Sequence, residues 1–313
     1  MTWQQLRDGF DHEHIDPFIT RHWNATPGTS MFISAAYNII YRFQANGAGY
    51  YLRICHPILH SIEDANATLA YLRHLAENGA PVNRPVKSVN GMYIERLPDD
   101  FYAQVVTEAQ GEEIGLDHTD LRVYEAWGES LGKLHRAATS FQPPQGTHYP
   151  TVQRFWENVR ETALRQDDPL REAFLRVDTW LKTLSTQDDY GLCHGDYRPG
   201  NVIWDTENFQ AVTVDFDEPN YHWFISDVVR ALLEFYDRPL AQRQAYRTAF
   251  LRGYCTAREL DDTWQAKWVP QMTDFAQMRG LLMHLWTIQE NEANGLPTND
   301  AWGRIWAVNR YEW

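Results

Sequence analysis

A polar loop followed by a short hairpin, in the second half of the chain, constrains the fold more than any other feature. In the segment HGDYRPGNVIWD (residues 194–205), His, Asp and Asn side chains precede an apolar run. A second apolar run follows, and it leads into the acidic residues of VDFDE (residues 214–218). The polar stretch DTENFQ between the runs has the length of a hairpin connection. Because a hairpin brings the ends of its strands together, Asp196, Asn201 and Asp215 are expected to meet at one end of it.

Hydrophobic periodicity divides the chain into a mixed part and a helical part. The first part predicts two strands, a helix and two more strands, within residues 37–54, 61–78, 92–95 and 102–109. From residue 119 helical periodicity dominates, with helices expected within residues 119–138, 151–186, 225–237 and 271–292 and strands at 201–204 and 211–216. The sequence therefore predicts an α+β, bilobal fold with a small N-terminal lobe, residues 1–108, and a larger helical lobe, residues 109–313, that contains the hairpin.

Composition excludes several classes of protein. The chain has 313 residues, of which 43% are hydrophobic, so it can bury a sizeable core. A net charge of −14 argues against a nucleic-acid partner, which requires a basic surface. No apolar run is long enough to span a membrane, and the N-terminus lacks the pattern of a signal peptide. Three scattered cysteines indicate reduced thiols, so we expect a cytoplasmic protein.

The side chains of the hairpin suit phosphoryl transfer. That reaction requires a positioned hydroxyl that loses a proton, and a divalent metal that bridges the phosphates of ATP. A carboxylate can accept the proton, and amide and carboxylate oxygens are the hard ligands that Mg²⁺ prefers.

At these residues the chain resembles the aminoglycoside phosphotransferase and choline kinase-like family, which is similar in fold to protein kinases. HGDYRPGN followed by VDFDE looks like the catalytic loop and metal-binding segment of that family. The resemblance implies that Asp196 is the catalytic base, that Asn201 and Asp215 hold Mg²⁺, and that His194 braces the loop. It also implies that Asp227, at the start of the next helix, hydrogen-bonds the catalytic loop.

Three charged residues beside this motif each keep two interpretations. Arg198 could offset charge on the transferred phosphoryl group, or it could pair with a neighbouring acid. Asp217 and Glu218 could contact the metal or the substrate, or they could form a solvated rim.

The resemblance also assigns nucleotide contacts to the first lobe. Residues 30–38 (SMFISAAYN) would be the loop over the phosphates; this loop has no GxGxxG run but offers Ser34 and Asn38 as polar contacts. Arg53 stands where family members carry the basic residue that holds the α- and β-phosphates. The backbone of the inter-lobe connection would meet the adenine edge at Thr107, Glu108 and Ala109.

The helix of the first lobe departs from the kinase pattern. The position that usually supplies a Glu to orient the phosphate-binding cation carries Thr68. Asp64, one turn earlier, or its neighbour Glu63 could replace it, although Ser61 and Asp64 also form a capping-box pattern.

The acceptor is expected to be a small molecule. Asp215 and Asp227 are only twelve positions apart, which leaves no room for a long peptide-docking segment. The candidate acceptor contacts combine acid with aromatic groups and so suit a cation; they are Asp217, Glu218, Tyr221, Trp223, Met278, Trp286 and Glu290. Met278 and Trp286, which stand at helical spacing, fit the core of a helical bundle as well.

The sequence thus predicts an ATP- and Mg²⁺-dependent phosphotransferase that acts on the hydroxyl of an amino alcohol, aminoglycoside, amino acid or sugar. Two alternatives stay open. Arg53 and Thr68 would also fit a nucleotide-binding regulatory protein with weak or no transfer. The other alternative is a kinase that phosphorylates Ser or Thr residues of proteins.

Overall fold

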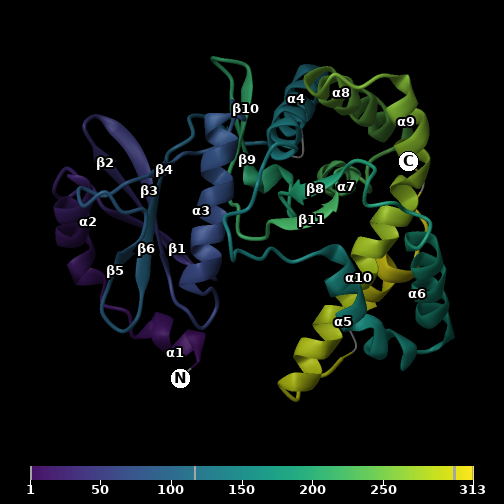
Figure 1. The fold of residues 1–313 in the computed structure, drawn as a ribbon, viewed down its shortest axis with the longest axis horizontal. Coiled ribbons are helices and arrows are strands. Elements are labelled where there is room, and N and C mark those ends of the chain that lie inside the picture. Colours follow the sequence, from purple (N-terminus) through teal and green to yellow (C-terminus); the bar gives the residue numbers. More distant parts are fainter. Residues whose placement is uncertain (1, 116–117, 299–300, 312) are drawn as a thin grey trace. The chain divides into compact units, whose positions relative to one another are not determined.

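The computed structural model describes residues 2–115, 118–298, 301–311 and 313, which form two compact units (Figure 1). The first division follows Gly111, and the chain then returns to the first unit twice. Unit 1 consists of Met1–Gly111, Phe141–His148 and Val212–Val214, and unit 2 of Glu112–Ser140, Tyr149–Ala211 and Asp215–Trp313.

Unit 1 is an antiparallel sheet with helices. Its strands are ordered β1-β2-β3-β6-β4, and β5 also pairs with β6. The strands are β1 (Met31–Ala35), β2 (Ile39–Ala45), β3 (Ala48–Cys55), β4 (Pro85–Val86), β5 (Glu95–Arg96) and β6 (Tyr102–Thr107). The helices are α1 (Trp3–Asp8), α2 (Ile15–Trp23) and α3 (Ile62–Glu77).

The hairpin of β2 and β3 confirms the two strands predicted within residues 37–54. Asn46 and Gly47 both have positive φ, 51° and 77°, which matches the right-handed twist of the flanking strands. Side chains alternate along β2, so Ile39, Tyr41 and Phe43 enter the core of the unit.

Two predictions for unit 1 need correction. Of the loop predicted at residues 30–38, residues 31–35 form the edge strand β1, which pairs with β2 from Met31 opposite Arg42 onward. A register shift between Phe32 and Ser34 interrupts this pairing. The strand expected at residues 92–95 is limited to Glu95–Arg96.

Unit 2 is mainly helical, as predicted. Its helices are α4 (Leu121–Ala138), α5 (Val152–Leu164), α6 (Asp168–Leu181), α7 (Ile225–Leu233), α8 (Leu240–Arg258), α9 (Asp262–Trp268), α10 (Met272–Ala293) and α11 (Ala301–Val308). Two small sheets accompany them, ordered β10-β9-β7 and β11-β8. Their strands are β7 (Glu112–Glu113), β8 (Tyr190–Cys193), β9 (Val202–Asp205), β10 (Gln210–Thr213) and β11 (Asn220–Trp223). Within the described residues, no helix combines the length and the apolar character that crossing a membrane requires.

Candidate active site

The loop between β8 and β9 is anchored by one buried carboxylate. Asp227, in the first turn of α7, is 1% exposed, and it accepts hydrogen bonds from the backbone N–H of His194 (2.8 Å) and of Gly195 (3.1 Å). The contact expected between Asp227 and the loop is therefore present. His135 of α4 donates a third bond through Nε2 (3.1 Å).

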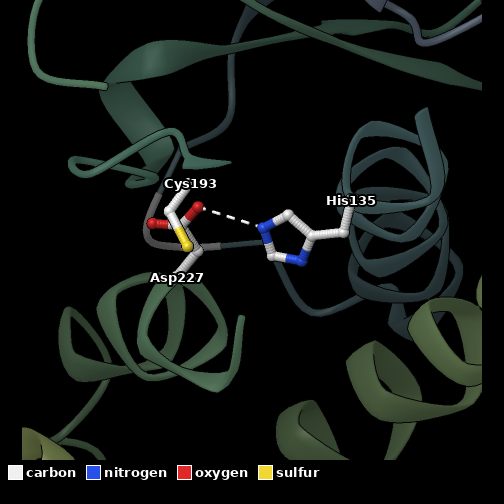
Figure 2. Close-up of side chains that lie close together, drawn as sticks. All are labelled: His135, Cys193 and Asp227. Carbon is white, nitrogen blue, oxygen red and sulfur yellow. Dashed lines mark hydrogen bonds and ion pairs between the residues drawn. The ribbon is translucent and has the colours of Figure 1, made fainter. Parts of the chain in front are cut away.

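Figure 2 shows that His135 and Cys193 lie beside this anchor. The ligand atoms of the three side chains lie within 4.8 Å of one another, a grouping that could hold a metal ion. However, Asp227 already accepts three hydrogen bonds, and Nδ1 of His135 lies 2.9 Å from the hydroxyl of Tyr254. Burial also raises the pKa of the Cys193 thiol, which keeps it protonated. We therefore assign this cluster to anchoring the loop.

The protonation states of the buried pair follow from the same contacts. Burial lowers the pKa of His135, so its imidazole is neutral and donates from one nitrogen while it accepts at the other. Burial acts to raise the pKa of Asp227, but the donors from His135 and His194 outweigh it and lower that pKa. A neutral imidazole thus faces an ionised carboxylate.

Gly195 allows the acidic segment to approach the loop. Its φ is +88°, and a Cβ at this position would lie 2.2 Å from the carbonyl oxygen of Glu218. Strand pairing supports the same approach, because Asn220 of β11 lies opposite Cys193 of β8. The loop and the segment from Asp215 to Glu218 therefore lie against each other.

Asp196 and Asn201 are in direct contact, as predicted. The amide Nδ2 of Asn201 donates to the carbonyl oxygen of Asp196 (2.9 Å) and to its Oδ2 (3.2 Å). Because both bonds use the amide nitrogen, the amide oxygen of Asn201 is turned away from Asp196. That oxygen is suited to bind a divalent cation.

Acidic side chains are concentrated beside this pair. Asp215 is exposed and has an unusual φ of 66°. Glu218 reaches the surface, yet the surrounding protein raises its pKa, and the carboxylates of Asp196, Asp217 and Asp215 raise it further. A divalent cation would offset this repulsion between carboxylates, so the carboxylate and amide oxygens present fit a metal site.

Three arginines surround the carboxylate of Asp196. Arg198 donates to Oδ2 (3.0 Å), whereas Arg230 of α7 (2.7 Å) and Arg279 of α10 (3.1 Å) donate to Oδ1. Burial acts to raise the pKa of Asp196, but the guanidinium charges, led by Arg230, outweigh it and lower that pKa. Of the two interpretations of Arg198, the pairing with a neighbouring acid is the one observed here.

Arg230, Arg279 and His135 were not predicted from the sequence. Each lies within an apolar helical pattern, DVVRALL, FAQMRGLL or LGKLHRAA. A charged or polar side chain in such a pattern requires a buried partner, and this requirement could have marked the three residues as candidates.

The predicted acceptor contacts fall into two groups. Trp223 and Met278 are 2% and 1% exposed and belong to the core of unit 2, and the indole N–H of Trp223 donates to the carbonyl oxygen of Ser185 (3.0 Å). The structure therefore does not present them to an acceptor, which corrects the prediction. Tyr221 is half-buried and stacks on Tyr190, with ring centroids 6.2 Å apart.

Trp286 and Glu290 of α10 are exposed, Trp286 to 49%. The spacing of Arg279, Met283, Trp286 and Glu290 places all four on one face of the helix. This face begins at Arg279, which contacts Asp196, and continues along the surface of α10.

Three of the candidate nucleotide contacts lie on or beside strands β1–β3 of unit 1. Arg53 lies on β3 between Ile40 of β2 and Gln104 of β6. Ser34 is exposed on β1, whereas Asn38 is buried and lies 3.0 Å from the thiol of Cys55 through its Oδ1.

Asp64 takes part in capping α3. Ser61 accepts from the backbone N–H of Asp64 (3.0 Å) and donates its hydroxyl to the Asp64 carboxylate (2.7 Å). The reciprocal backbone bond of a full capping box is thus replaced by a bond between side chains.

The connection after β6 uses two of its three backbone donors internally. The N–H of Thr107 donates to the carbonyl of Arg84 (2.9 Å), and the N–H of Glu108 donates to the carbonyl of Gly49 (3.0 Å). The carboxylate of Glu108 accepts a fork of two bonds from Arg42, at 2.7 and 2.9 Å. The backbone N–H groups of Thr107 and Glu108 are therefore already bonded within unit 1.

Comparison with known proteins agrees with the geometry of the loop. Residues 32–266 match the phosphotransferase enzyme family. The chain belongs to this family. It is a small-molecule phosphotransferase, a kinase whose acceptor is an alcohol group.

Known relatives of this phosphotransferase span most of its length. It is 28% identical over 300 residues to the amicoumacin kinase of Bacillus subtilis (strain 168), covering 90% of this chain and 86% of that relative. It is also 28% identical over 253 residues to the homoserine kinase of Methylobacillus glycogenes, covering 78% of this chain and 75% of that one.

Solved structures share the fold of this phosphotransferase. An amicoumacin kinase in complex with AMP-PNP and Ca²⁺ superposes with a TM-score of 0.79 at 23% identity, covering 97% of this chain and 94% of the other. A microcompartment-associated aminopropanol kinase gives 0.66 at 20% identity, covering 88% and 89%. These likenesses confirm the predicted α+β, protein-kinase-like fold class.

Proposed function

We propose that this phosphotransferase moves the γ-phosphoryl group of ATP to the hydroxyl of a small molecule, with Mg²⁺ as the metal. The observation that carries the proposal is the contact between Asp196 and Asn201 beside the acidic segment from Asp215 to Glu218. It gives a proton acceptor and metal ligands on one short stretch of chain, the combination that phosphoryl transfer requires.

In the proposed reaction, the hydroxyl group of the substrate that receives the phosphoryl group donates a hydrogen bond to the carboxylate of Asp196. The hydroxyl oxygen forms a bond to the γ-phosphorus while the bridging O–P bond breaks, and ADP leaves with that electron pair. The proton of the hydroxyl passes to Asp196. Asn201 and Asp215 would hold Mg²⁺, which would supply positive charge to the phosphate oxygens. His194 and Asp227 keep the loop in place.

Nucleotide binding is assigned to polar groups of unit 1. Arg53 is proposed to pair with the α- and β-phosphates, and Ser34 to contact them from β1. Asn38 and Asp64 are secondary candidates, because each already contacts a side chain of its own unit. Ala109 and the carbonyl groups of Thr107 and Glu108 are proposed to meet the adenine.

The acceptor is proposed to carry an amine as well as a hydroxyl. Homoserine and aminopropanol, which appear in the names of two relatives, both have these groups. Exposed Trp286 and Glu290 suit a cationic group through the indole face and the carboxylate. Asp217, Glu218 and Tyr221 are the proposed contacts closer to Asp196.

A regulatory protein that binds nucleotide without efficient transfer is the second candidate. One observation favours it: the Asp64 carboxylate accepts the Ser61 hydroxyl, so the acid expected to orient Arg53 is already engaged. This candidate predicts nucleotide binding without turnover on any acceptor.

A phosphate-transfer screen tests both candidates. ADP formation would be measured with ATP and Mg²⁺ over amicoumacin, homoserine, aminopropanol, choline and simple sugars. We expect turnover with at least one amine-bearing alcohol, and we expect Asp196→Ala to lower kcat by at least about a hundredfold. Asp205→Asn, at the last residue of β9, is the matched control and should keep full activity. ATP binding without turnover would favour the regulatory candidate, and absence of nucleotide binding would exclude both.

A further inference from the structure

Every hydrogen-bonding position of the Asp196 carboxylate is occupied in this structure. Oδ1 accepts from Arg230 and Arg279, and Oδ2 accepts from Arg198 and Asn201. An ionised carboxylate has about four acceptor positions. An acceptor hydroxyl therefore cannot donate to Asp196 until one of these four donors leaves.

The two donors on Oδ1 are held at their other ends. Arg230 is 13% exposed and also pairs with Glu234 one turn further along α7 (2.5 Å). Arg279 donates a second bond to the carbonyl of Gly195 (3.2 Å). Each of these two arginines is therefore restrained by a second contact within the site.

Of the two donors on Oδ2, Asn201 is also held. It is 3% exposed, and its amide donates in addition to the backbone carbonyl of Asp196. Arg198 differs from the other three donors. Its side chain is 43% exposed, and the bond to Oδ2 is the one hydrogen bond that its guanidinium makes to the described residues.

We infer, on the basis of the proposed function, that Arg198 is a displaceable partner of the catalytic carboxylate, whereas Arg230 and Arg279 are positioning residues that act through it. Arg198 occupies Oδ2 before nucleotide binds and moves to the phosphate oxygens afterwards. Oδ2 then accepts the hydroxyl of the acceptor, while Oδ1 stays bound to both positioning arginines.

The chemistry of the guanidinium group supports this exchange. Phosphate oxygens are better partners for a partly exposed arginine than a carboxylate oxygen that three other donors already share, because they allow a bidentate pair. The same movement unites both roles considered for Arg198, since it pairs with an acid in one state and offsets phosphoryl charge in the other. The site therefore becomes competent for an acceptor only when nucleotide is present.

Nuclear magnetic resonance of the arginine Nε–H groups tests the inference on the full chain, with Mg²⁺–AMP-PNP as the probe. Arg198 and Arg230 both donate to Asp196 through Nε, so each reports on one carboxylate oxygen. Arg198→Lys and Arg230→Lys would assign the two signals. Arg252 is the internal control, because its Nε donates to Glu125 (2.8 Å) on an exposed pair outside the site.

We expect nucleotide to shift the Arg198 signal and to change its hydrogen exchange at least about tenfold, while the signals of Arg230 and Arg252 stay in place. Gly200→Ala provides an independent check, since a Cβ there would lie 2.7 Å from Nη1 of Arg198 and should displace this guanidinium before nucleotide is added.

The outcomes separate the inference from the function on which it rests. An Arg198 signal that is unchanged at saturating nucleotide, or an Arg230 signal that moves with it, would overturn the inference while the proposed function stands. If Mg²⁺–AMP-PNP neither binds nor raises the melting temperature, the proposed function fails and the inference fails with it.

Discussion

At the scale of single residues, the conformation of the loop between β8 and β9 depends on Gly195 and Asp227. Gly195 adopts a backbone conformation that other residues rarely take, in a place where a side chain would collide with the backbone of Glu218. Asp227 collects backbone donors of the loop on one buried carboxylate. Both residues act on the position of Asp196 without being the reacting group.

Gly195→Ala is expected to lower the free energy of unfolding by about 3 kcal/mol and to reduce transfer activity. The backbone strain of alanine at positive φ and the collision of its Cβ with Glu218 both contribute to this loss. Gly146→Ala is the matched control, because Gly146 also has positive φ (+81°) but has open space where the Cβ would be. It should cost about 1 kcal/mol, from backbone strain alone. Urea unfolding measures both values, and equal losses would contradict the predicted collision.

Asp227→Asn is expected to destabilise the protein by about 3 kcal/mol. The asparagine keeps the shape but loses the charge, and its amide nitrogen would face N–H donors that require an acceptor. Chemical denaturation at neutral pH measures the loss. Asp261→Asn, at the exposed N-cap of α9, should change stability by less than about 0.5 kcal/mol, because asparagine caps helices as well as aspartate does. Comparable losses for the two variants would argue against Asp227 as the anchor.

At the scale of secondary-structure elements, α4 and α8 pack through glycines. A Cβ at Gly128 of α4 would lie 2.0 Å from the carbonyl oxygen of Phe250, and one at Gly253 of α8 would lie 1.9 Å from that of Glu125. The two backbones therefore touch at these points, which brings α4 close enough for His135 to contact Tyr254 of α8 as well as Asp227.

Gly128→Ala is expected to destabilise unit 2 by about 2–3 kcal/mol, although alanine is the better helix former by about 1 kcal/mol, because the helices would have to separate. Glu129→Ala, the next residue on α4, is the control and should change little. Thermal unfolding of both variants measures the effect. A more stable Gly128→Ala variant would show that propensity outweighs this close packing.

At the scale of the whole molecule, buried histidines link folding to pH. Burial lowers the pKa of His222 from 6.5 to about 3, and burial also lowers the pKa of His135. In the unfolded chain these imidazoles bind protons below pH 6.5, whereas in the folded protein they stay neutral until much lower pH. The unfolded state therefore gains protons as the pH falls, and stability decreases.

The contribution of His222 to the free energy of unfolding is expected to fall by about 2 kcal/mol between pH 7 and pH 5. Urea unfolding at both pH values would measure it as the difference between the wild type and His222→Gln, which does not titrate. The same pH dependence in His222→Gln as in the wild type would rule out this linkage.

The sequence alone determined the features of this protein that depend on local chemistry. The hairpin of β2 and β3, the Ser61 cap of α3 and the contact between Asp196 and Asn201 join residues close in the chain, so spacing and residue type were sufficient. The acidic segment after β10 could also be predicted, because the whole motif from His194 to Glu218 lies on one short stretch of sequence.

Only the tertiary structure decided which distant groups surround the carboxylate of Asp196. Arg230 and Arg279 lie 34 and 83 positions from Asp196, and His135 lies 92 from Asp227, and no local pattern encodes such pairings. Burial likewise assigned Trp223 to the core, because periodicity cannot separate a buried aromatic from one that faces a ligand. Such contacts are set by how whole helices pack, which depends on the complete chain.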